Sequence, residues 1–243
     1  IDDHFLNVFN TSNTIYKATN GAFDPTIGAV VNAWDFGPEG KIVALDSLKI
    51  DSLMLGVGFN KVSVKNNTIT KPESTFIDFN AIAKGYGVDV IGIFLESKNV
   101  ENYLVEIGGE ISVKGHKSDG SQWRIAVEKP TEDGQEVQQV IELDTMALAT
   151  SGDYRIYHEE NGERFSHLID PRSGYPIKHK LASATVLHKS SMTADGYATA
   201  MMVLGTEASL ALAKEQNLAI MLIEKQEQGY QVYYSEAFKP YLN

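Results

Sequence analysis

The sequence of 243 residues predicts an α+β fold, in which strands occupy the middle of the chain and helices precede and follow them. Apolar residues recur at helical spacing in the first hundred residues. From residue 102 to residue 170 they form alternating or short apolar runs broken by turn residues. Helical spacing returns after residue 190. Because no repeat, linker or low-complexity tract interrupts this order, we expect one domain over residues 1–243.

The composition is that of a globular protein, with 43% hydrophobic and 22% charged residues. A formal net charge of −11 argues against nucleic acid as a partner. The absence of cysteine excludes disulfides, thiolate metal sites and a cysteine nucleophile. No apolar run approaches the roughly 20 residues of a membrane span. Since the chain starts at Ile1 rather than Met, we expect a mature fragment, from which any export or lipid-attachment segment would have been removed.

Local signals at the start of the chain predict three helices and a hairpin. An amphipathic helix is expected before Gly21, where the glycine ends the periodic run. A short apolar helix follows, with Thr26 placed to cap it. Residues 46–58 resemble a third helix, and residues 61–70 read as a hairpin turned at two asparagines.

Residues 76–97 predict a strand that runs into a long helix. Asp78, Ala81 and Lys84 are spaced by three, so the strand end and the first helical turns can aim all of them at one place. A lysine near a helix N-terminus gains nothing from the helix dipole, and its position is favourable if a phosphate lies there. The alternative is a surface lysine that projects into water.

Three features stand out in the strand-rich middle. Gly108 and Gly109 interrupt a predicted strand, which indicates a bulge or a place where another backbone or a flat ligand comes close. His167 lies on a turn-rich loop that contains Asp-Pro, and a histidine there can accept a proton near neutral pH. The alternative is a histidine with a structural role. Asn-Gly at 161–162 predicts a hairpin turn.

Residues 191–205 predict a helix that a serine at 190 or 191 caps and a glycine ends. Asp195 and Thr199 are four residues apart, so their oxygens emerge on one face of this helix. A carboxylate and a hydroxyl suit Mg²⁺, which keeps several waters and needs few protein ligands when a substrate phosphate completes its shell. The alternative is a solvated helix face. A strand before this helix, a helix after it and a closing hairpin complete the chain.

Six segments in this order resemble the ApbE family, the FAD:protein FMN transferases: AFDPTIG, DFNAIAKGYGVD, VEIGGE, TSGDY, HLIDPRSGYP and SMTADGYATA. The resemblance extends from Gly21 to Leu222. The N-terminal part of the family domain, with its lipoprotein signal, is missing. The resemblance implies a single ApbE-like, T-fold-like domain of α+β class, with mixed antiparallel sheets packed by helices. Gly87 departs from the pattern, because many relatives have alanine there.

The resemblance also implies roles for individual residues. Asp195, Thr199 and the backbone carbonyl of Ala81 would bind Mg²⁺, and His167 would be the base. The residues implied to contact FAD are Ala22, Phe23, Asp24, Asp78, Lys84, Gly108, Gly109 and Ile169.

The implied reaction is a magnesium-dependent transfer of FMN from FAD to a threonine hydroxyl of an acceptor flavoprotein, with release of AMP. The same site suits hydrolysis of the FAD pyrophosphate to FMN and AMP. A third possibility is a periplasmic protein that binds FAD without turnover. By the same resemblance, the full-length protein is expected to be periplasmic and attached to a bacterial membrane only through a lipid anchor absent from this chain.

Overall fold

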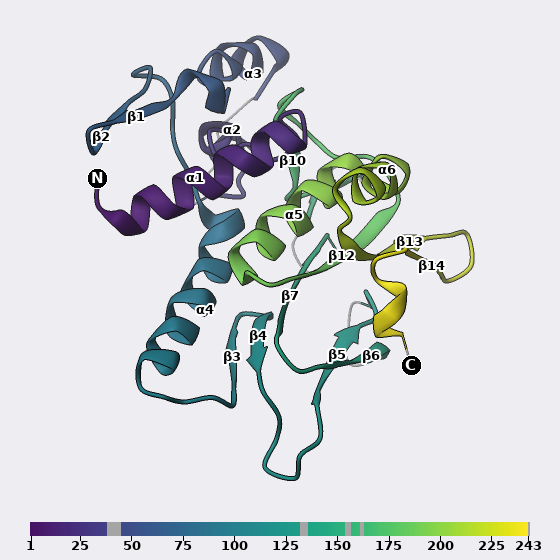
Figure 1. Cartoon of the computed structure of the whole chain (residues 1–243). Helices are drawn as coiled ribbons and strands as arrows, with labels where there is room; N and C mark the ends of the chain where they lie inside the picture. The colour runs from purple at the N-terminus through teal and green to yellow at the C-terminus, as the bar shows by residue number, and fades with distance from the viewer. Residues whose placement is uncertain (38–44, 132–135, 154–156, 161–162, 243) are drawn as a thin grey trace. The chain divides into compact units, whose positions relative to one another are not determined.

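The computed structural model describes residues 1–37, 45–131, 136–153, 157–160 and 163–242 (Figure 1). The chain divides into two compact units. The first unit comprises Ile1–Ala81 and Ile156–Lys178, and the second comprises Ile82–Arg155 and His179–Asn243. The prediction of one domain over the whole chain is not tested by this division and stays a prediction.

The first unit begins with helix α1, Asp3–Ala18, whose N-cap Asp2 accepts a hydrogen bond from the Phe5 amide. Its buried stripe is Val8, Phe9, Ser12 and Ile15. The other helices are α2, Gly28–Ala33, α3, Ser47–Met54, and the 3₁₀ turn η1, Phe59–Lys61. All three predicted helices are therefore confirmed, although the third is shorter than expected.

The strands of the first unit form small antiparallel hairpins. They are β1, Ser63–Lys65, with β2, Thr68–Thr70; β8, Tyr157–Glu160, with β9, Glu163–Ser166; and β10, Ile169–Asp170, with β11, Tyr175–Pro176. Asn66 and Asn67 both have positive φ, at 51° and 57°, as the tight turn between β1 and β2 requires. The predicted turn at 161–162 lies outside the described residues.

Two expectations for the first unit are wrong. The predicted strand at residues 76–79 is reduced to one bridge, in which Phe76 pairs with Ile27. Helix α2 has Ile27 as its N-cap and no side-chain cap, so Thr26 does not cap it. The Thr26 hydroxyl instead donates to Asp24 Oδ1 and accepts from the Gly58 amide, and both partners lie outside α2.

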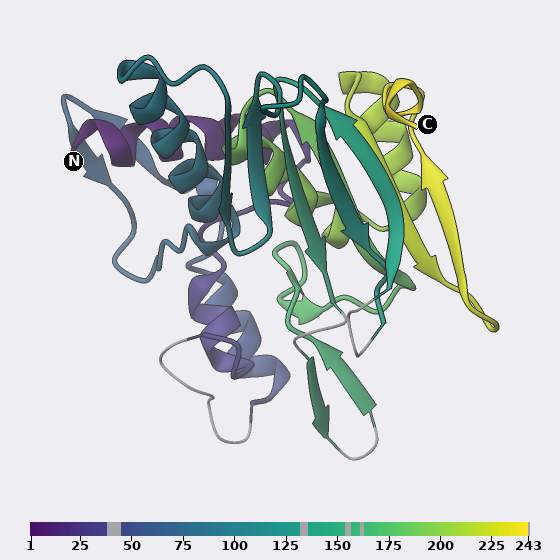
Figure 2. The same cartoon turned by 90° about the horizontal axis from the view of Figure 1, so that it is seen from below.

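The second unit contains a six-stranded sheet in the order β14-β13-β12-β7-β4-β3, and all neighbours are antiparallel (Figures 1 and 2). The strands are β3, Tyr103–Ile107; β4, Glu110–Lys114; β7, Met146–Gly152; β12, Leu181–His188; β13, Ala219–Lys225; and β14, Tyr230–Tyr234. A hairpin of β5, Trp123–Glu128, and β6, Val137–Leu143, accompanies this sheet. The predicted series of strands in the middle of the chain is confirmed.

Both faces of this sheet are covered. Helix α5, Ser191–Leu204, packs across β7 and β12, and α6, Thr206–Gln216, packs against α5 and β13. The β5-β6 hairpin and the C-terminal residues share a buried apolar cluster with the sheet, which includes Val113, Ile125, Ile141, Leu148, Leu187, Met221 and Phe238. Because side chains alternate along a strand, Leu148 faces this cluster, and its buried neighbours Ala147 and Ala149 face the opposite way.

Gly108 and Gly109 form the two-residue turn between β3 and β4, so the expected bulge within one strand is wrong. Both have positive φ, at 59° and 99°, which glycine adopts without strain.

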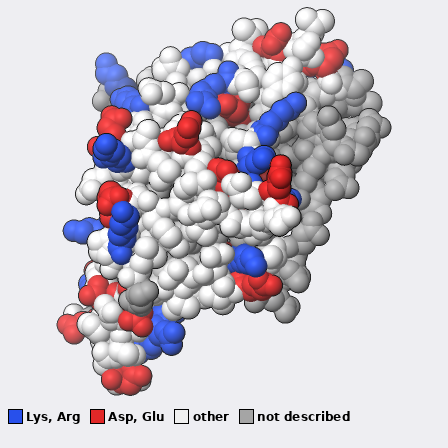
Figure 3. Space-filling model, turned by 90° about the vertical axis from the view of Figure 1, so that its right-hand side faces the viewer, with Lys and Arg blue, Asp and Glu red and all other residues white. Residues whose placement is uncertain are grey.

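Helix α4, Asn80–Ser97, precedes β3. Among the described residues, no helix is both long and apolar enough to cross a membrane. On the face drawn in Figure 3, basic and acidic side chains are interspersed.

Candidate functional site

Helix α5 carries both side chains that were predicted to bind a metal. Ser190 caps the helix and accepts a hydrogen bond from the Thr193 amide, as expected. Asp195 is buried, with 4% of its surface exposed, and Thr199 one turn later is partly buried. The alternative of a solvated helix face is wrong for Asp195, because a carboxylate this deeply buried is withdrawn from water.

Asp195 contacts helix α4 at a glycine. Its Oδ2 accepts a hydrogen bond of 3.0 Å from the Gly85 amide. A Cβ at Gly85 would lie 2.3 Å from the Ser191 carbonyl oxygen and 2.8 Å from Asp195 Cβ, so only glycine permits the helices to approach this closely. The glycine inside a helical pattern was the available signal for this contact.

Lys84 pairs with Glu110, the residue that follows the Gly108-Gly109 turn. The two atoms, Lys84 Nζ and Glu110 Oε2, are 2.6 Å apart. The Glu110 side chain is 2% exposed and that of Lys84 is 46% exposed. The lysine is thus tethered at its charged end by a buried carboxylate rather than projecting freely into water. No role for Glu110 had been predicted, because nothing in sequence spacing pairs residues 84 and 110.

The two buried carboxylates of this cluster favour a cation. Burial raises the pKa of Asp195 to about 6; the Gly85 amide opposes this, the Glu110 charge adds to it and the Lys84 charge lowers it. Burial also raises the pKa of Glu110, against the effect of Lys84. Apart from its ion pair, Glu110 Oε2 has no hydrogen bond of regular geometry within the described part of the chain. The partly exposed Lys84 is therefore paired with Glu110, and it acts on Asp195 through its charge alone in the interactions described.

The side-chain oxygens of Asp195 and Thr199 fit Mg²⁺, which takes hard oxygen ligands and needs only one or two protein carboxylates. Asp195 supplies a buried carboxylate, and Thr199 follows it by one turn on the same helix. Among the described residues, no group of three or more His, Cys, Asp or Glu side chains is arranged to hold a metal. An ion at Asp195 would therefore complete its shell with hydroxyl, backbone, water or substrate oxygens.

In the first unit, the Asp24 carboxylate is already occupied by internal hydrogen bonds. Its Oδ1 accepts from the Thr26 amide at 2.8 Å and from the Thr26 hydroxyl at 2.6 Å, and its Oδ2 accepts from the Phe59 amide at 3.1 Å. Burial raises the pKa of Asp24, and these hydrogen bonds counteract the rise. Ala22 and Phe23 before it are buried. The Asp24 carboxylate therefore has fewer acceptor positions left for a ligand than a carboxylate without these hydrogen bonds.

Asp78 lies beside the segment of Asp24. Its amide donates to the Pro25 carbonyl at 2.7 Å, and its Oδ1 accepts from the Asn80 amide at 2.8 Å at the entry to α4. A Cβ at Gly28 would lie 2.4 Å from the Phe76 ring and 3.0 Å from Asp78 Cβ, which shows how closely the two segments pack. The structure thus brings Ala22, Phe23, Asp24 and Asp78 into one region of the first unit.

His167 and Ile169 lie on the segment that joins β9 to β11. The His167 ring is partly buried and makes an edge contact with Phe36, with 6.3 Å between ring centroids. Ile169 is buried against Val30 and Val57. The following turn is rigid, because the Asp170 carboxylate binds the backbone and guanidinium of the arginine two residues later. The base role of His167 stays a prediction.

The predicted residues are divided between the units. The second unit contains Lys84, Gly108, Gly109, Asp195 and Thr199, and the remaining predicted residues belong to the first.

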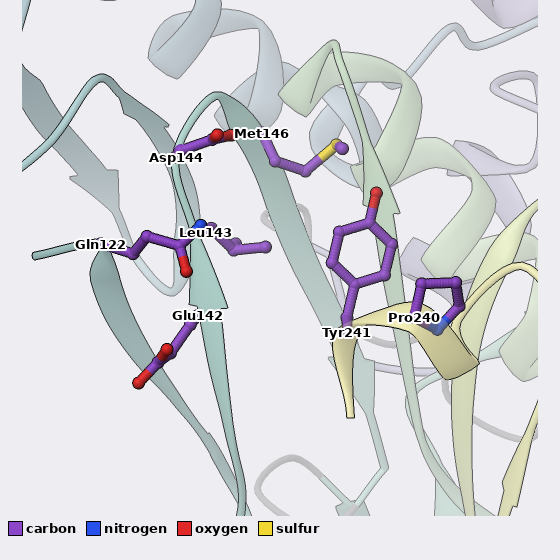
Figure 4. A pocket seen from close by; sticks show the side chains of 7 residues that line it. All are labelled: Gln122, Glu142, Leu143, Asp144, Met146, Pro240 and Tyr241. Atoms are coloured by element: carbon purple, nitrogen blue, oxygen red, sulfur yellow. The ribbon is translucent and has the colours of Figure 1, made fainter. Parts of the chain in front are cut away.

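A pocket of about 270 Å³ in the second unit contains none of the predicted site residues (Figure 4). Its lining residues are Gln122, Glu142, Leu143, Asp144, Met146, Pro240 and Tyr241. With two carboxylates and no cation, this lining is unsuited to a dinucleotide diphosphate.

Comparison with known proteins identifies close relatives. The model of the ApbE family matches residues 1–222. The FAD:protein FMN transferase of Vibrio cholerae serotype O1 is 46% identical over 229 residues, which cover 93% of this chain and 68% of that protein. That of Haemophilus influenzae is 45% identical over 246 residues, with coverages of 98% and 71%. The structure of the flavin transferase ApbE from Vibrio cholerae matches with a TM-score of 0.91 at 42% identity, covering 100% of this chain and 78% of that one. The predicted mixture of antiparallel sheets and helices is thus confirmed.

Proposed function

The chain belongs to the ApbE family, and on that premise we propose that it is an FAD:protein FMN transferase. FAD is then its substrate and a protein is its acceptor, as the names of its relatives state for those proteins, and we propose that this acceptor is a flavoprotein. We further propose that the acceptor group is a threonine hydroxyl, that the reaction requires Mg²⁺ and that AMP is released.

The observation that carries this proposal is the buried Asp195 beside Lys84 and Glu110 in a chain of this family. Asp195 and Thr199, with the backbone carbonyl of Ala81, are the proposed protein ligands of Mg²⁺. When bound, the ion supplies a Lewis acid that neutralises charge on the phosphoryl oxygens of FAD. An acidic protein that binds an acidic dinucleotide needs such a local cation, because its net charge of −11 opposes the ligand.

Lys84 is the proposed second cation for the FAD diphosphate. Its tether to Glu110 holds its ammonium group in one place before any substrate arrives, and its 46% exposure leaves part of the side chain accessible. A pre-positioned charge stabilises a phosphoryl-transfer transition state without reorganisation during the reaction. The glycines of the neighbouring turn leave room there, because a Cβ at Gly109 would meet no atom within 4 Å.

His167 is the proposed general base. It takes the proton of the acceptor hydroxyl on an imidazole nitrogen, the hydroxyl oxygen forms a bond to the FMN-side phosphorus, and the bond from that phosphorus to the bridging oxygen breaks. AMP leaves with the bridging oxygen, and the acceptor retains FMN through a phosphodiester. Roles in FAD binding for Ala22, Phe23, Asp24, Asp78, Gly108, Gly109 and Ile169 are part of the same proposal.

Hydrolysis of FAD is the second candidate, because water can replace the acceptor hydroxyl at the same proposed metal and base residues.

Family analogy also supports a periplasmic, lipid-anchored location for the full-length protein, which we retain as a proposal. A protein that only stores FAD is disfavoured by a histidine on a rigid loop, since storage needs no base.

Mass spectrometry of an acceptor flavoprotein incubated with the enzyme, FAD and Mg²⁺ tests the transfer. We expect the acceptor to gain the mass of FMN less one water on a threonine, and AMP to appear in equal amount. Asp195→Ala should abolish the metal-dependent reaction. Asp119→Ala is the control, because Asp119 is exposed and its carboxylate accepts hydrogen bonds from the amide and hydroxyl of Ser121 in its own turn. Unmodified acceptor under every metal condition would refute the transferase, and FMN with AMP but no modified acceptor would favour hydrolysis.

A further inference from the structure

Asp89 of helix α4 binds the N-terminus of helix α5. Its Oδ2 accepts hydrogen bonds from the Ser190 hydroxyl at 2.7 Å and the Met192 amide at 3.0 Å, and its Oδ1 accepts from the Ser191 amide at 2.8 Å. One partly buried carboxylate thus contacts the N-cap and the first two residues of another helix.

These contacts complete the capping of α5. The first four amides of an α-helix have no partner within the helix. At α5 these four amides are those of residues 190–193: Ser190 donates to His188 Nδ1, Ser191 and Met192 donate to Asp89, and Thr193 donates to the side chain of Ser190. The negative charge also lies at the positive end of the helix dipole, where it is stabilising.

The origin of this cap distinguishes α5 from other helices of the chain. Asp2 caps α1 and Asp46 caps α3, and each bonds an amide only three residues later. Asp89 is 102 residues away from the amide of Ser191. A local cap stabilises its own helix, whereas Asp89 also fixes α5 to α4.

A second contact lies one turn away on α4. Residues 85 and 89 are four apart and share a helix face. The Gly85 amide bonds Asp195, so α4 holds α5 both at its first turn and at the proposed metal ligand. Because Asp195 follows Ser191 by about one turn, movement of the first turn of α5 displaces the Asp195 carboxylate.

We propose that Asp89 is a positioning residue for the metal site, which holds α5 so that Asp195 and Thr199 present their oxygens to the ion. This inference rests on the metal assignment within the proposed function. Residues that orient metal ligands without touching the metal typically change metal affinity by about 10–100-fold when they are replaced.

The test is direct binding of Mn²⁺ to the full chain, in the wild type and in Asp89→Asn. The concentration of free Mn²⁺ is measured by electron paramagnetic resonance. The amide keeps the size of the side chain but loses its charge and one acceptor. We expect the dissociation constant to rise by about 10–100-fold. Ser190→Ala, which leaves both amide contacts of Asp89 in place, should cause a smaller rise. Asp46→Asn is the matched control, since it removes the charge of an exposed N-cap on α3.

Hydrogen exchange of the amides of residues 191–194 supplies a second readout. Asp89→Asn should expose these amides to faster exchange under conditions in which the rest of the chain stays protected. Unchanged Mn²⁺ affinity in a folded Asp89→Asn, or an equal loss in Asp46→Asn, would overturn the positioning role and leave the proposed function intact. A wild type that binds no Mn²⁺ would overturn the metal assignment and this inference together.

Discussion

Replacing Gly85 by alanine should separate helices α4 and α5. The added Cβ would lie 2.3 Å from the Ser191 carbonyl oxygen and 2.6 Å from its carbon, and backbone atoms cannot rotate away as a flexible side chain can. The helices must therefore move apart. This movement would lengthen the 3.0 Å hydrogen bond from the Gly85 amide to Asp195.

The magnitude follows from three contributions. Forcing a methyl group into a packed interface costs about 1–3 kcal/mol. Loss of a hydrogen bond to a buried carboxylate costs about 1.5–3 kcal/mol. Alanine favours the helix over glycine by about 1 kcal/mol, which offsets part of the loss. We expect the free energy of unfolding of Gly85→Ala to fall by about 2–5 kcal/mol.

Gly87→Ala is the control in the same helix. Within the described part of the chain, the atom that its Cβ would meet is Cδ1 of Ile107 at 3.1 Å, which is the far end of a flexible side chain. This variant should equal or exceed the wild type in stability by up to about 1 kcal/mol. Urea unfolding of both variants, with Mn²⁺ binding as a second measurement, gives the comparison. If the two substitutions have equal effects, the close approach of α4 and α5 at Gly85 is wrong.

Three further predictions concern stability. Lys84→Met should destabilise the fold by leaving the buried Glu110 without a cation, and adding Glu110→Gln should restore part of the loss; a double-mutant cycle in urea checks this, and additivity would contradict it. Thr26→Val should cost about 2–4 kcal/mol in urea unfolding, because the partly buried Gly58 amide loses its acceptor and the buried Asp24 carboxylate loses one of its three donors. The exposed Thr14→Val is its control, and equal losses would refute the reasoning. Burial lowers the pKa of His188 from its ordinary 6.5, so its stabilising effect should be complete above pH 6.5 and decline as pH falls toward the lowered pKa. Melting temperatures of wild type and His188→Asn between pH 5 and 8 test this; parallel curves would disprove it.

Features encoded by neighbouring residues were predictable from the sequence. The cap at Ser190 and the asparagine turn between β1 and β2 depend on side chains within a few residues of each other, and both are confirmed. The Gly108-Gly109 turn was missed for a different reason. Two glycines between alternating segments satisfy a two-residue hairpin turn as well as a bulge, and the hairpin pattern was the better signal.

Contacts between distant residues were not predictable from spacing. The Gly85 amide and Asp195 are 110 residues apart, and Thr26 and Gly58 are 32 apart. Whether a threonine before an apolar helix caps it depends on competing partners, and here Asp24 and Gly58 bind its hydroxyl. Only the folded chain shows these competing partners. The sequence correctly indicated that the Thr26 hydroxyl forms hydrogen bonds, but it predicted the wrong partner.

The hydrogen-bond donors around the buried carboxylates separate two kinds of acid. Burial raises the pKa of both Asp24 and Asp195. Asp24 accepts three hydrogen bonds from Thr26 and Phe59, which stabilise its charge inside the protein and fix the local loop. Asp195 accepts one, from Gly85, within the described part of the chain. A buried carboxylate with so few donors is costly unless a cation joins it. The hydrogen bonds of Asp24 therefore stabilise the fold of its own segment, and the low number of donors at Asp195 supports our proposal that this carboxylate binds the ion.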